Sequence, residues 1–346
     1  MIRFLDKKGK LINADYKPTE AQKKQLLAMY KIMVRSRQWD NYSLTLQKTG
    51  RLGTFAPNLG EEAALAAIGY NLKKDDWYAP HYRALPTLLA RGVEMKSIYA
   101  YWNGSELGSK MPGLNTLPMQ VIIGSQTSMA GGVASALKAN GKGQICLTTI
   151  GNGGTNEGEF HEGLNMASVR NWPLVMVVMN NQWAISVPEH HSYKVKTLSQ
   201  RAMSYGIPSV RVDGNDLLAT SEVIKEAYEY TRKGNGPILI EMLTWRQGQH
   251  TTSDNPRVYR SREEEEKHEE WEPFHRIEAY LLKEKIITKD QIEALAQEAE
   301  AEAKQAYADS AAILSSEGFD DIYDYTYETM PAELAEQKEA NRRFLK

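Results

Sequence analysis

The sequence predicts an α/β fold in which helices cover both faces of a mostly parallel sheet, giving three layers. Short apolar runs rich in β-branched residues alternate with helical patterns along the chain. Two of these runs, Ile145–Ile150 and Leu174–Met179, enclose a glycine-rich turn and a helical segment. This is the order of a parallel β-α-β unit. Polar residues follow both runs directly, and ligands bind at the carboxyl ends of strands in such sheets.

The composition fits one large α/β domain with extensions. The chain has 346 residues, of which 42% are apolar and 25% charged, as in ordinary globular proteins. A formal net charge of −2 gives no support to a nucleic-acid partner. The single cysteine, Cys146, lies in a predicted buried strand, so we expect a reducing compartment and no intrachain disulfide. The charged start of the chain and the short apolar runs predict a cytoplasmic protein.

Three parts are predicted along the chain. A polar arm comes first, and Thr19 or Glu20 begins a helix that packs on the core or on another chain. The middle part contains the strands, and in it Thr155 or Asn156 could cap the helix that follows the glycine-rich turn. The last part is helical. Their ranges are 1–45 (arm and helix, partner contacts), 46–275 (α/β domain) and 276–346 (helical extension).

The turn itself, GNGGTNEG, has features of a phosphate and metal site. Gly153 and Gly154 would let the backbone approach a diphosphate, and Asn152 and Asn181 offer side-chain oxygens to a cation such as magnesium. The GxGxxG spacing of dinucleotide-binding folds and the lysine of a P-loop are both missing. Glycine-rich turns and Asn pairs also end many ordinary strands, so the residues alone leave both interpretations open.

Together, GNGGTNEG and the later NNQWAISVP resemble the thiamine-diphosphate motif. From about Gln47 to its end the chain resembles the α subunits of the first, decarboxylating component of 2-oxo acid dehydrogenase complexes, closest to bacterial pyruvate dehydrogenase. The resemblance implies the three-layer thiamin-diphosphate-binding fold. It also implies a magnesium ion held by the side chains of Asn152 and Asn181 and the backbone carbonyl of Trp183, with Gly153 and Gly154 against the cofactor.

One position departs from the family pattern, which has Asp where this chain has Asn152. An amide oxygen can still bind magnesium, but the site loses a negative charge, and charge count sets affinity. We expect a working enzyme with weaker metal retention. The alternative is a non-catalytic assembly or regulatory paralogue.

Further site residues follow from the same resemblance. Arginine can bind phosphate with two directed hydrogen bonds, although a single Arg more often forms a surface ion pair. The family match assigns Tyr82, Arg83 and Arg246 to the diphosphate and places Ile123 beneath the bent cofactor. His250 is the only histidine in a predicted site loop, and imidazole suits proton transfer near neutral pH. The resemblance gives His250 a role in the reductive acylation of a lipoyl group.

The resemblance implies the α subunit of pyruvate dehydrogenase, working as an α2β2 heterotetramer with the lipoyl domain and core of an acyltransferase. The chain offers no candidate for the carboxylate that activates the aminopyrimidine, which the family places on the β subunit. The chain alone should therefore be inactive. A branched-chain 2-oxo acid dehydrogenase is the alternative, favoured by the HTTSDNP loop. The potassium site of that group is not expected, because Val121 and Ile122 replace its hydroxyl residues.

Overall fold

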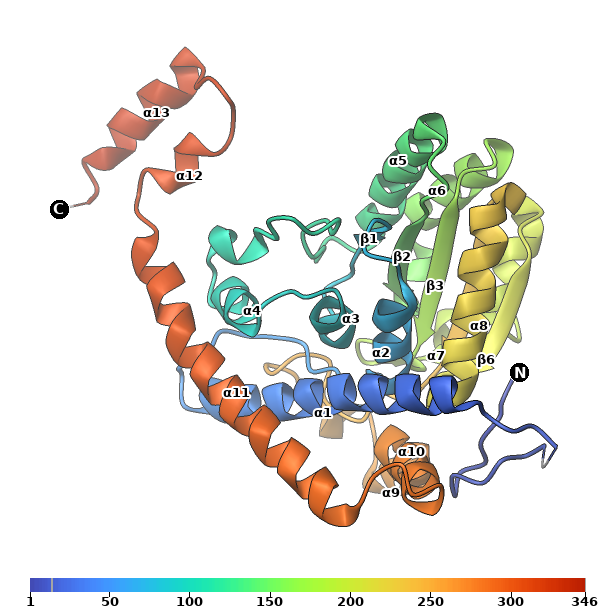
Figure 1. The fold of residues 1–346 in the computed structure, drawn as a ribbon. Coiled ribbons are helices and arrows are strands. Elements are labelled where there is room, and N and C mark those ends of the chain that lie inside the picture. Colours follow the sequence, from blue (N-terminus) through green and yellow to red (C-terminus); the bar gives the residue numbers. More distant parts are fainter. Residues whose placement is uncertain (14, 346) are drawn as a thin grey trace.

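The computed structural model describes residues 1–13 and 15–345. Five strands form one parallel sheet in the order β1-β2-β3-β7-β6, and two short strands, β4 and β5, form an antiparallel pair (Figure 1). The strands are β1 (Trp77–Ala79), β2 (Cys146–Gly151), β3 (Leu174–Asn180), β4 (Trp183–Ala184), β5 (Val187–Pro188), β6 (Ser209–Asp213) and β7 (Ile238–Leu243).

Helical segments surround this sheet. The α-helices are α1 (Glu20–Lys48), α2 (Glu62–Asn71), α3 (Leu85–Ala90), α4 (Met95–Trp102), α5 (Ser125–Asn140), α6 (Gly158–Val169), α7 (Glu189–Ser192), α8 (Leu217–Tyr230), α9 (Arg262–Lys267), α10 (Pro273–Lys283), α11 (Lys289–Ser316), α12 (Asp321–Asp324) and α13 (Ala332–Arg342). The short 3-10 and π segments are η1 (Glu106–Ser109), η2 (Gly153–Asn156), η3 (Leu198–Tyr205), η4 (Thr231–Asn235), η5 (Pro256–Val258) and η6 (Glu269–Trp271).

The central strand β3 shows how the three layers are held together. Every residue of β3 is buried, as expected for a parallel strand covered on both faces. Val175 and Val177 pack in a cluster with α2, α3 and α8, whereas Met176 and Val178 pack with α6 and η3 on the opposite face. The predicted three-layer α/β fold is confirmed.

The predicted central strands are confirmed with small shifts at their ends. The β2 strand begins one residue later than expected and includes Gly151, and β3 extends through Asn180. The expected cap of α6 is wrong. Glu157 is the N-cap residue, the Thr155 hydroxyl donates to the Asn152 carbonyl at 2.6 Å, and the Asn156 amide donates to Ser192.

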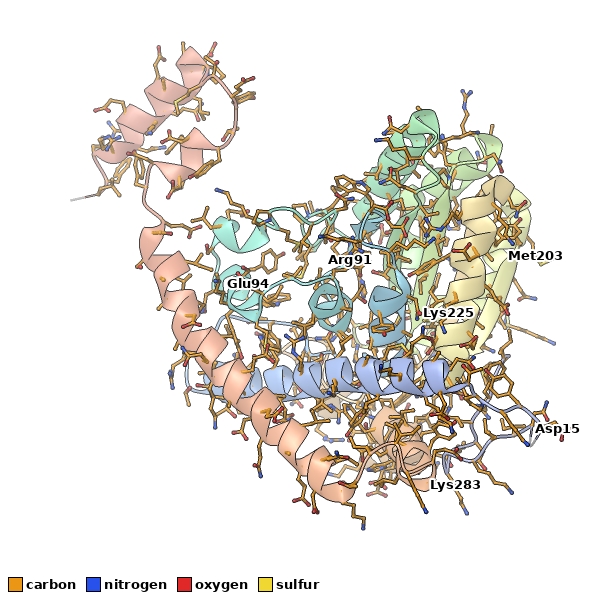
Figure 2. All side chains as sticks on the ribbon, viewed as in Figure 1. Asp15, Arg91, Glu94, Met203, Lys225 and Lys283 are labelled. Carbon is orange, nitrogen blue, oxygen red and sulfur yellow. The ribbon has the colours of Figure 1, made fainter. Side chains whose placement is uncertain are left out.

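Helix α1 begins as predicted, because Thr19 and Gln22 form a reciprocal capping box. The helix then packs against α2 and α11 within the chain and crosses the proposed boundary at residue 45. Figures 1 and 2 show α12 and α13, with their side chains, standing away from the α/β body beyond the end of α11. The three-part division of the chain remains a prediction.

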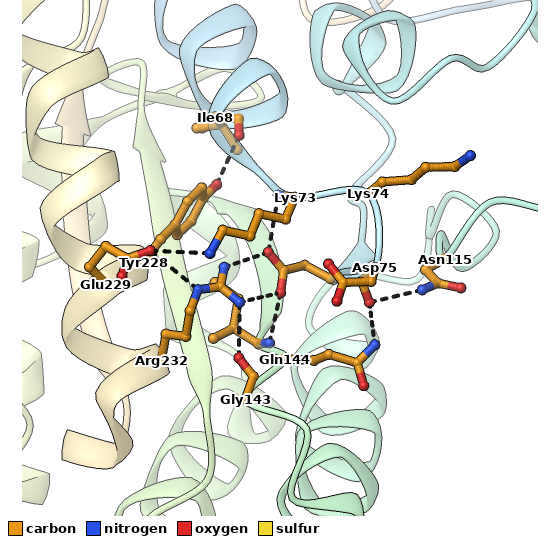
Figure 3. A network of polar contacts seen from close by, with 12 residues as sticks. Ile68, Lys73, Lys74, Asp75, Asn115, Gly143, Gln144, Tyr228, Glu229 and Arg232 are labelled. Carbon is orange, nitrogen blue, oxygen red and sulfur yellow. Dashed lines mark hydrogen bonds and ion pairs between the residues drawn. The ribbon is translucent and has the colours of Figure 1, made fainter.

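An ion pair joins the amino ends of β1 and β2 to η4, the segment that follows α8 (Figure 3). The Arg232 guanidinium donates to the Asp76 carboxylate at 3.0 and 2.7 Å. The same carboxylate accepts from the backbone N–H groups of Lys73 and Ile145, both at 3.0 Å. Asp76 is fully buried, and both of its carboxylate oxygens accept hydrogen bonds. This network therefore fixes the amino ends of the strands, opposite to the end where the site is predicted.

Within the described chain, no helix is long and apolar enough to cross a membrane.

Candidate functional site

A cavity of about 650 Å³ lies at the carboxyl ends of β2 and β3. Loops from both sides of the sheet close around it, including the segments before α2, after β1 and after β7. Every predicted site residue except Arg246 lines the cavity. These residues are Tyr82, Arg83, Ile123, Asn152, Gly153, Gly154, Asn181, Trp183 and His250.

The two glycines of the turn are required by close packing. A Cβ on Gly153 would lie 2.7 Å from the Cβ of Ala184. A Cβ on Gly154 would lie 2.7 Å from a side-chain carbon of Ile150 and 2.9 Å from one of Ile123. Side chains at these positions would therefore displace the wall of the cavity. Glycine at these positions is therefore required by the protein's own packing as well as by the expected approach of a ligand.

Asn152 presents an unpaired amide to the site. Asn152 is 1% exposed, and neither the oxygen nor the nitrogen of its side chain has a hydrogen-bond partner among the described residues. A buried amide without partners is costly unless a ligand or water satisfies it. The position immediately after β2 and the free oxygen suit a cation ligand.

Asn181 is held in one orientation by two hydrogen bonds. Its side-chain nitrogen donates to Glu61 Oε1 at 2.7 Å, and its side-chain oxygen accepts from the Trp183 backbone N–H at 3.2 Å. This network assigns the amide orientation that leaves the oxygen on the Trp183 side. The Trp183 backbone and the Asn181 oxygen, both expected at the metal, are thus adjacent.

Sequence reasoning did not identify Glu61 as a site residue. It is 1% exposed and lines the cavity, with its Oε1 3.5 Å from Arg83 Nε. Burial raises the pKa of the Glu61 carboxyl, and the Arg83 charge and the Asn181 amide oppose this shift. The only sequence signal was the position of Glu61 in the Gly-Glu-Glu-Ala run at the start of α2. This run does not predict which residues Glu61 contacts.

Arg83 and His250 meet in the wall of the cavity. The Arg83 guanidinium donates to the His250 carbonyl at 2.8 Å and to the Pro57 carbonyl, and it lies 3.4 Å from His250 Nδ1. Burial, followed by the charges of Arg83 and Arg246, lowers the pKa of His250 to about 4. The imidazole is therefore neutral at physiological pH, so one ring nitrogen can donate a hydrogen bond and the other can accept one.

Arg246 lies behind the cavity wall. It is 1% exposed, and its Nη2 donates to the Tyr259 hydroxyl at 2.7 Å. Its Nε and Nη1 have no partner within the described part of the chain. Burial, and then the charge of Arg83, lowers the pKa of Arg246 to about 10, so the side chain remains cationic at neutral pH. Two buried N–H groups of a charged side chain are strong candidates for binding an anion.

A second histidine, His81, corrects the expectation that His250 is the only one in the site. His81 lines the cavity and is 4% exposed, with Nδ1 2.7 Å from the Thr149 hydroxyl. Burial, and then the Arg83 charge, lowers the pKa of His81 to about 3. Its position directly before Tyr82 was the signal that could have found it.

No group of three or more His, Cys, Asp or Glu side chains is arranged for a metal in residues 1–13 and 15–345. The proposed metal ligands Asn152 and Asn181 offer amide oxygens, and asparagine is not among those four residue types. Fold and site together define an α/β enzyme subunit whose cavity, at the carboxyl edge of a parallel sheet, combines a glycine turn with buried arginines and amide oxygens.

Comparison with known proteins places the chain in a family. The model of the "Dehydrogenase E1 component" family matches residues 30–316. A protein of Mycoplasma genitalium named "Pyruvate dehydrogenase E1 component subunit alpha" is 40% identical over all of this chain and 96% of its own length. Proteins with the same name from Acholeplasma laidlawii and Staphylococcus aureus are 40% and 36% identical, each over 98% of this chain and 99% and 92% of their own lengths.

The chain therefore belongs to the dehydrogenase E1 component family. The predicted resemblance is confirmed, and the chain is a subunit of a thiamine-diphosphate-dependent 2-oxo acid dehydrogenase.

Proposed function

We propose that this chain is the α subunit of a cytoplasmic pyruvate dehydrogenase. With a β subunit, in an α2β2 heterotetramer, it catalyses the oxidative decarboxylation of pyruvate and the reductive acetylation of the lipoyl group of an acyltransferase. The name shared by relatives that match this chain over nearly its whole length carries the proposal. That name favours pyruvate over the branched-chain 2-oxo acids.

The cavity fits thiamine diphosphate and magnesium. The unpaired amide of Asn152, the oriented amide of Asn181 and the Trp183 carbonyl would hold the metal. Arg83, with Tyr82 beside it, and the free N–H groups of Arg246 would bind the diphosphate next to Gly153 and Gly154. Ile123, 40% exposed at the cavity, would support the rings. When bound, the cofactor supplies the electron sink that lets a 2-oxo acid lose carbon dioxide.

His250 would serve the acetyl transfer. When the S–S bond of the lipoyl disulfide breaks, one sulfur takes the acetyl group and the other leaves as a thiolate. The neutral His250 imidazole can donate an N–H hydrogen bond to that thiolate, and the Arg83 contact to its carbonyl holds its backbone. The adjacent positive charges of Arg83 and Arg246 disfavour the imidazolium, so they favour release of its proton to that thiolate.

The test is 2-oxo acid-dependent dye reduction by the chain co-purified with its β partner, at saturating cofactor and magnesium. We expect turnover with pyruvate, much weaker turnover with 3-methyl-2-oxobutanoate, and none from the chain alone. A preference for the branched substrate would reassign the complex. No turnover with either substrate would contradict the catalytic proposal and support the assembly paralogue.

A further inference from the structure

The two side chains proposed as metal ligands, Asn152 and Asn181, are both neutral amides. Asn152 is neutral, whereas a divalent cation and its diphosphate are bound best when carboxylates contribute charge. Two carboxylates from the described residues line the cavity, Glu61 and Glu157. Glu157 is exposed, whereas Glu61 is 1% exposed. Glu61 is therefore the carboxylate whose charge acts in a low-dielectric setting.

The contacts of Glu61 direct that charge to the metal end of the site. Its shortest contact is the 2.7 Å hydrogen bond from Asn181, whereas Arg83 Nε lies 3.5 Å away. Arg83 makes its shorter bonds to the carbonyls of Pro57 and His250. Glu61 Oε2 has no hydrogen-bond partner in the part of the chain that the structure describes. The Glu61 carboxylate thus accepts its side-chain hydrogen bond from Asn181 and forms a longer ion pair with Arg83, with one oxygen free.

The backbone around Glu61 is also fixed. Its N–H donates to the Asn58 carbonyl at 3.0 Å, and it is the N-cap residue of α2. The preceding Gly60 has a φ of +92°, and a Cβ there would lie 2.0 Å from the Trp245 carbonyl oxygen. The carboxylate therefore projects from a rigid helix start, which is the usual requirement for a group that orients a metal ligand.

We propose that Glu61 is a positioning residue for the metal site, which fixes the Asn181 amide and supplies the negative charge that Asn152 lacks. This inference rests on the proposed function. The carboxylate holds the Asn181 nitrogen, so the Asn181 oxygen is left for the cation. Its charge lies one hydrogen bond from that ligand, where it raises cation affinity without direct coordination.

The experiment measures Mn²⁺ binding by electron paramagnetic resonance, using the α–β complex with saturating thiamine diphosphate. In Glu61→Gln the side-chain oxygen still accepts from Asn181 but the charge is lost. We expect the Mn²⁺ dissociation constant to rise about 10-fold. The double variant E61Q/N152D restores a charge at the metal and should return the constant to within about threefold of the unsubstituted complex.

Glu62→Gln is the matched control. Glu62 is an equally buried carboxylate one residue away, but it pairs with Arg37 at 2.6 Å and does not line the cavity. This variant should lower thermal stability while leaving the Mn²⁺ constant unchanged, so a general loss of packing is separated from an effect on the metal.

An unchanged Mn²⁺ constant in E61Q would overturn the inference, and so would a loss that N152D fails to rescue. Absence of Mn²⁺ binding by the unsubstituted complex would instead overturn the metal site of the proposed function, and the role of Glu61 with it. The two failures are distinguished by the first titration.

Discussion

Arg246 illustrates how a single buried residue can depend on a ligand. Two of its N–H groups have no partner among the residues described, although the side chain is charged and 1% exposed. Unpaired buried donors destabilise the folded chain until an acceptor binds. The energetic penalty in the free protein and the affinity for an anion therefore have the same origin.

Replacing Arg246 by Gln should weaken thiamine diphosphate binding about 10- to 100-fold. Each hydrogen bond to a charged group contributes about 1.5–3 kcal/mol, and about 1.4 kcal/mol corresponds to a factor of ten. The dissociation constant can be measured by quenching of tryptophan fluorescence, since Trp183 lines the cavity. Arg257→Gln is the control, because Arg257 pairs with Glu265 outside the cavity. Equal constants for the two variants would remove Arg246 from the phosphate site.

His81 should make the chain less stable in acid. Its pKa is lowered to about 3 in the folded chain, against about 6.5 when unfolded, so the unfolded state binds more protons between these values. The contribution of His81 to the free energy of unfolding is fully present above pH 6.5. It falls by about 1.4 kcal/mol per pH unit as the pH drops from 6.5 toward 3.

The check is the melting temperature of His81→Gln between pH 7.5 and pH 5. Gln does not titrate and can still form a hydrogen bond with Thr149. The melting temperature of the variant should therefore fall less between pH 7.5 and pH 5 than that of the unsubstituted chain. Identical pH dependence in the two proteins would show that His81 is not the group responsible.

At the scale of elements, the site depends on strands held in register from their far end. The Asp76 network ties the loop before β1, the start of β2 and the η4 segment after α8 into one unit. Because β2 pairs with both β1 and β3, an error at this edge would shift the glycine turn at the other end of β2.

Asp76→Ala should destabilise the chain by about 3 kcal/mol, because it leaves Arg232 and two backbone N–H groups without their acceptor. Its neighbour gives a matched control. Asp75 is exposed, and the hydrogen bonds made to it use its backbone carbonyl (Figure 3), so Asp75→Ala should change stability by less than about 0.5 kcal/mol. Denaturant unfolding of both variants measures the difference, and comparable losses would refute the assigned role.

At the scale of the whole molecule, α12 and α13 are weakly attached. Helix α13 has no buried residue among those the structure describes, and the unit projects beyond α11 (Figure 1). Its exposed apolar side chains include Ile322 and Tyr325. Glu317, by contrast, accepts hydrogen bonds from Ser105 and the Leu107 backbone and so belongs to the body.

Deleting residues 318–346 should leave the melting temperature of the chain within about 2 °C of its original value, because little buried surface is lost. Deleting residues 289–346 removes α11 as well, which packs on α1 and α4, and should lower the melting temperature strongly. Differential scanning calorimetry on both truncations makes the comparison. A large loss from the shorter deletion would mean that α12 and α13 stabilise the body.

Much of the fold could be predicted from local patterns. The runs that became β2 and β3 are apolar because both of their faces are covered, and this burial is visible in the residues themselves. The glycine turn and the Asn pair follow those strands directly, so parallel pairing alone brings them to one edge of the sheet. The sequence alone therefore predicts that Asn152, Gly153, Gly154 and Asn181 lie at one end of the sheet.

By itself, then, the sequence determined the layer order, the family and the position of the turn, because each depends on neighbouring residues or on a continuous motif. Only the tertiary structure decided that Glu61 bonds to Asn181, 120 positions away, and that His81 lies in the same cavity. No local sequence pattern predicts which residue a buried carboxylate will contact. Its role depends on which charges and amides the folded chain places beside it, and on the exclusion of water from between them.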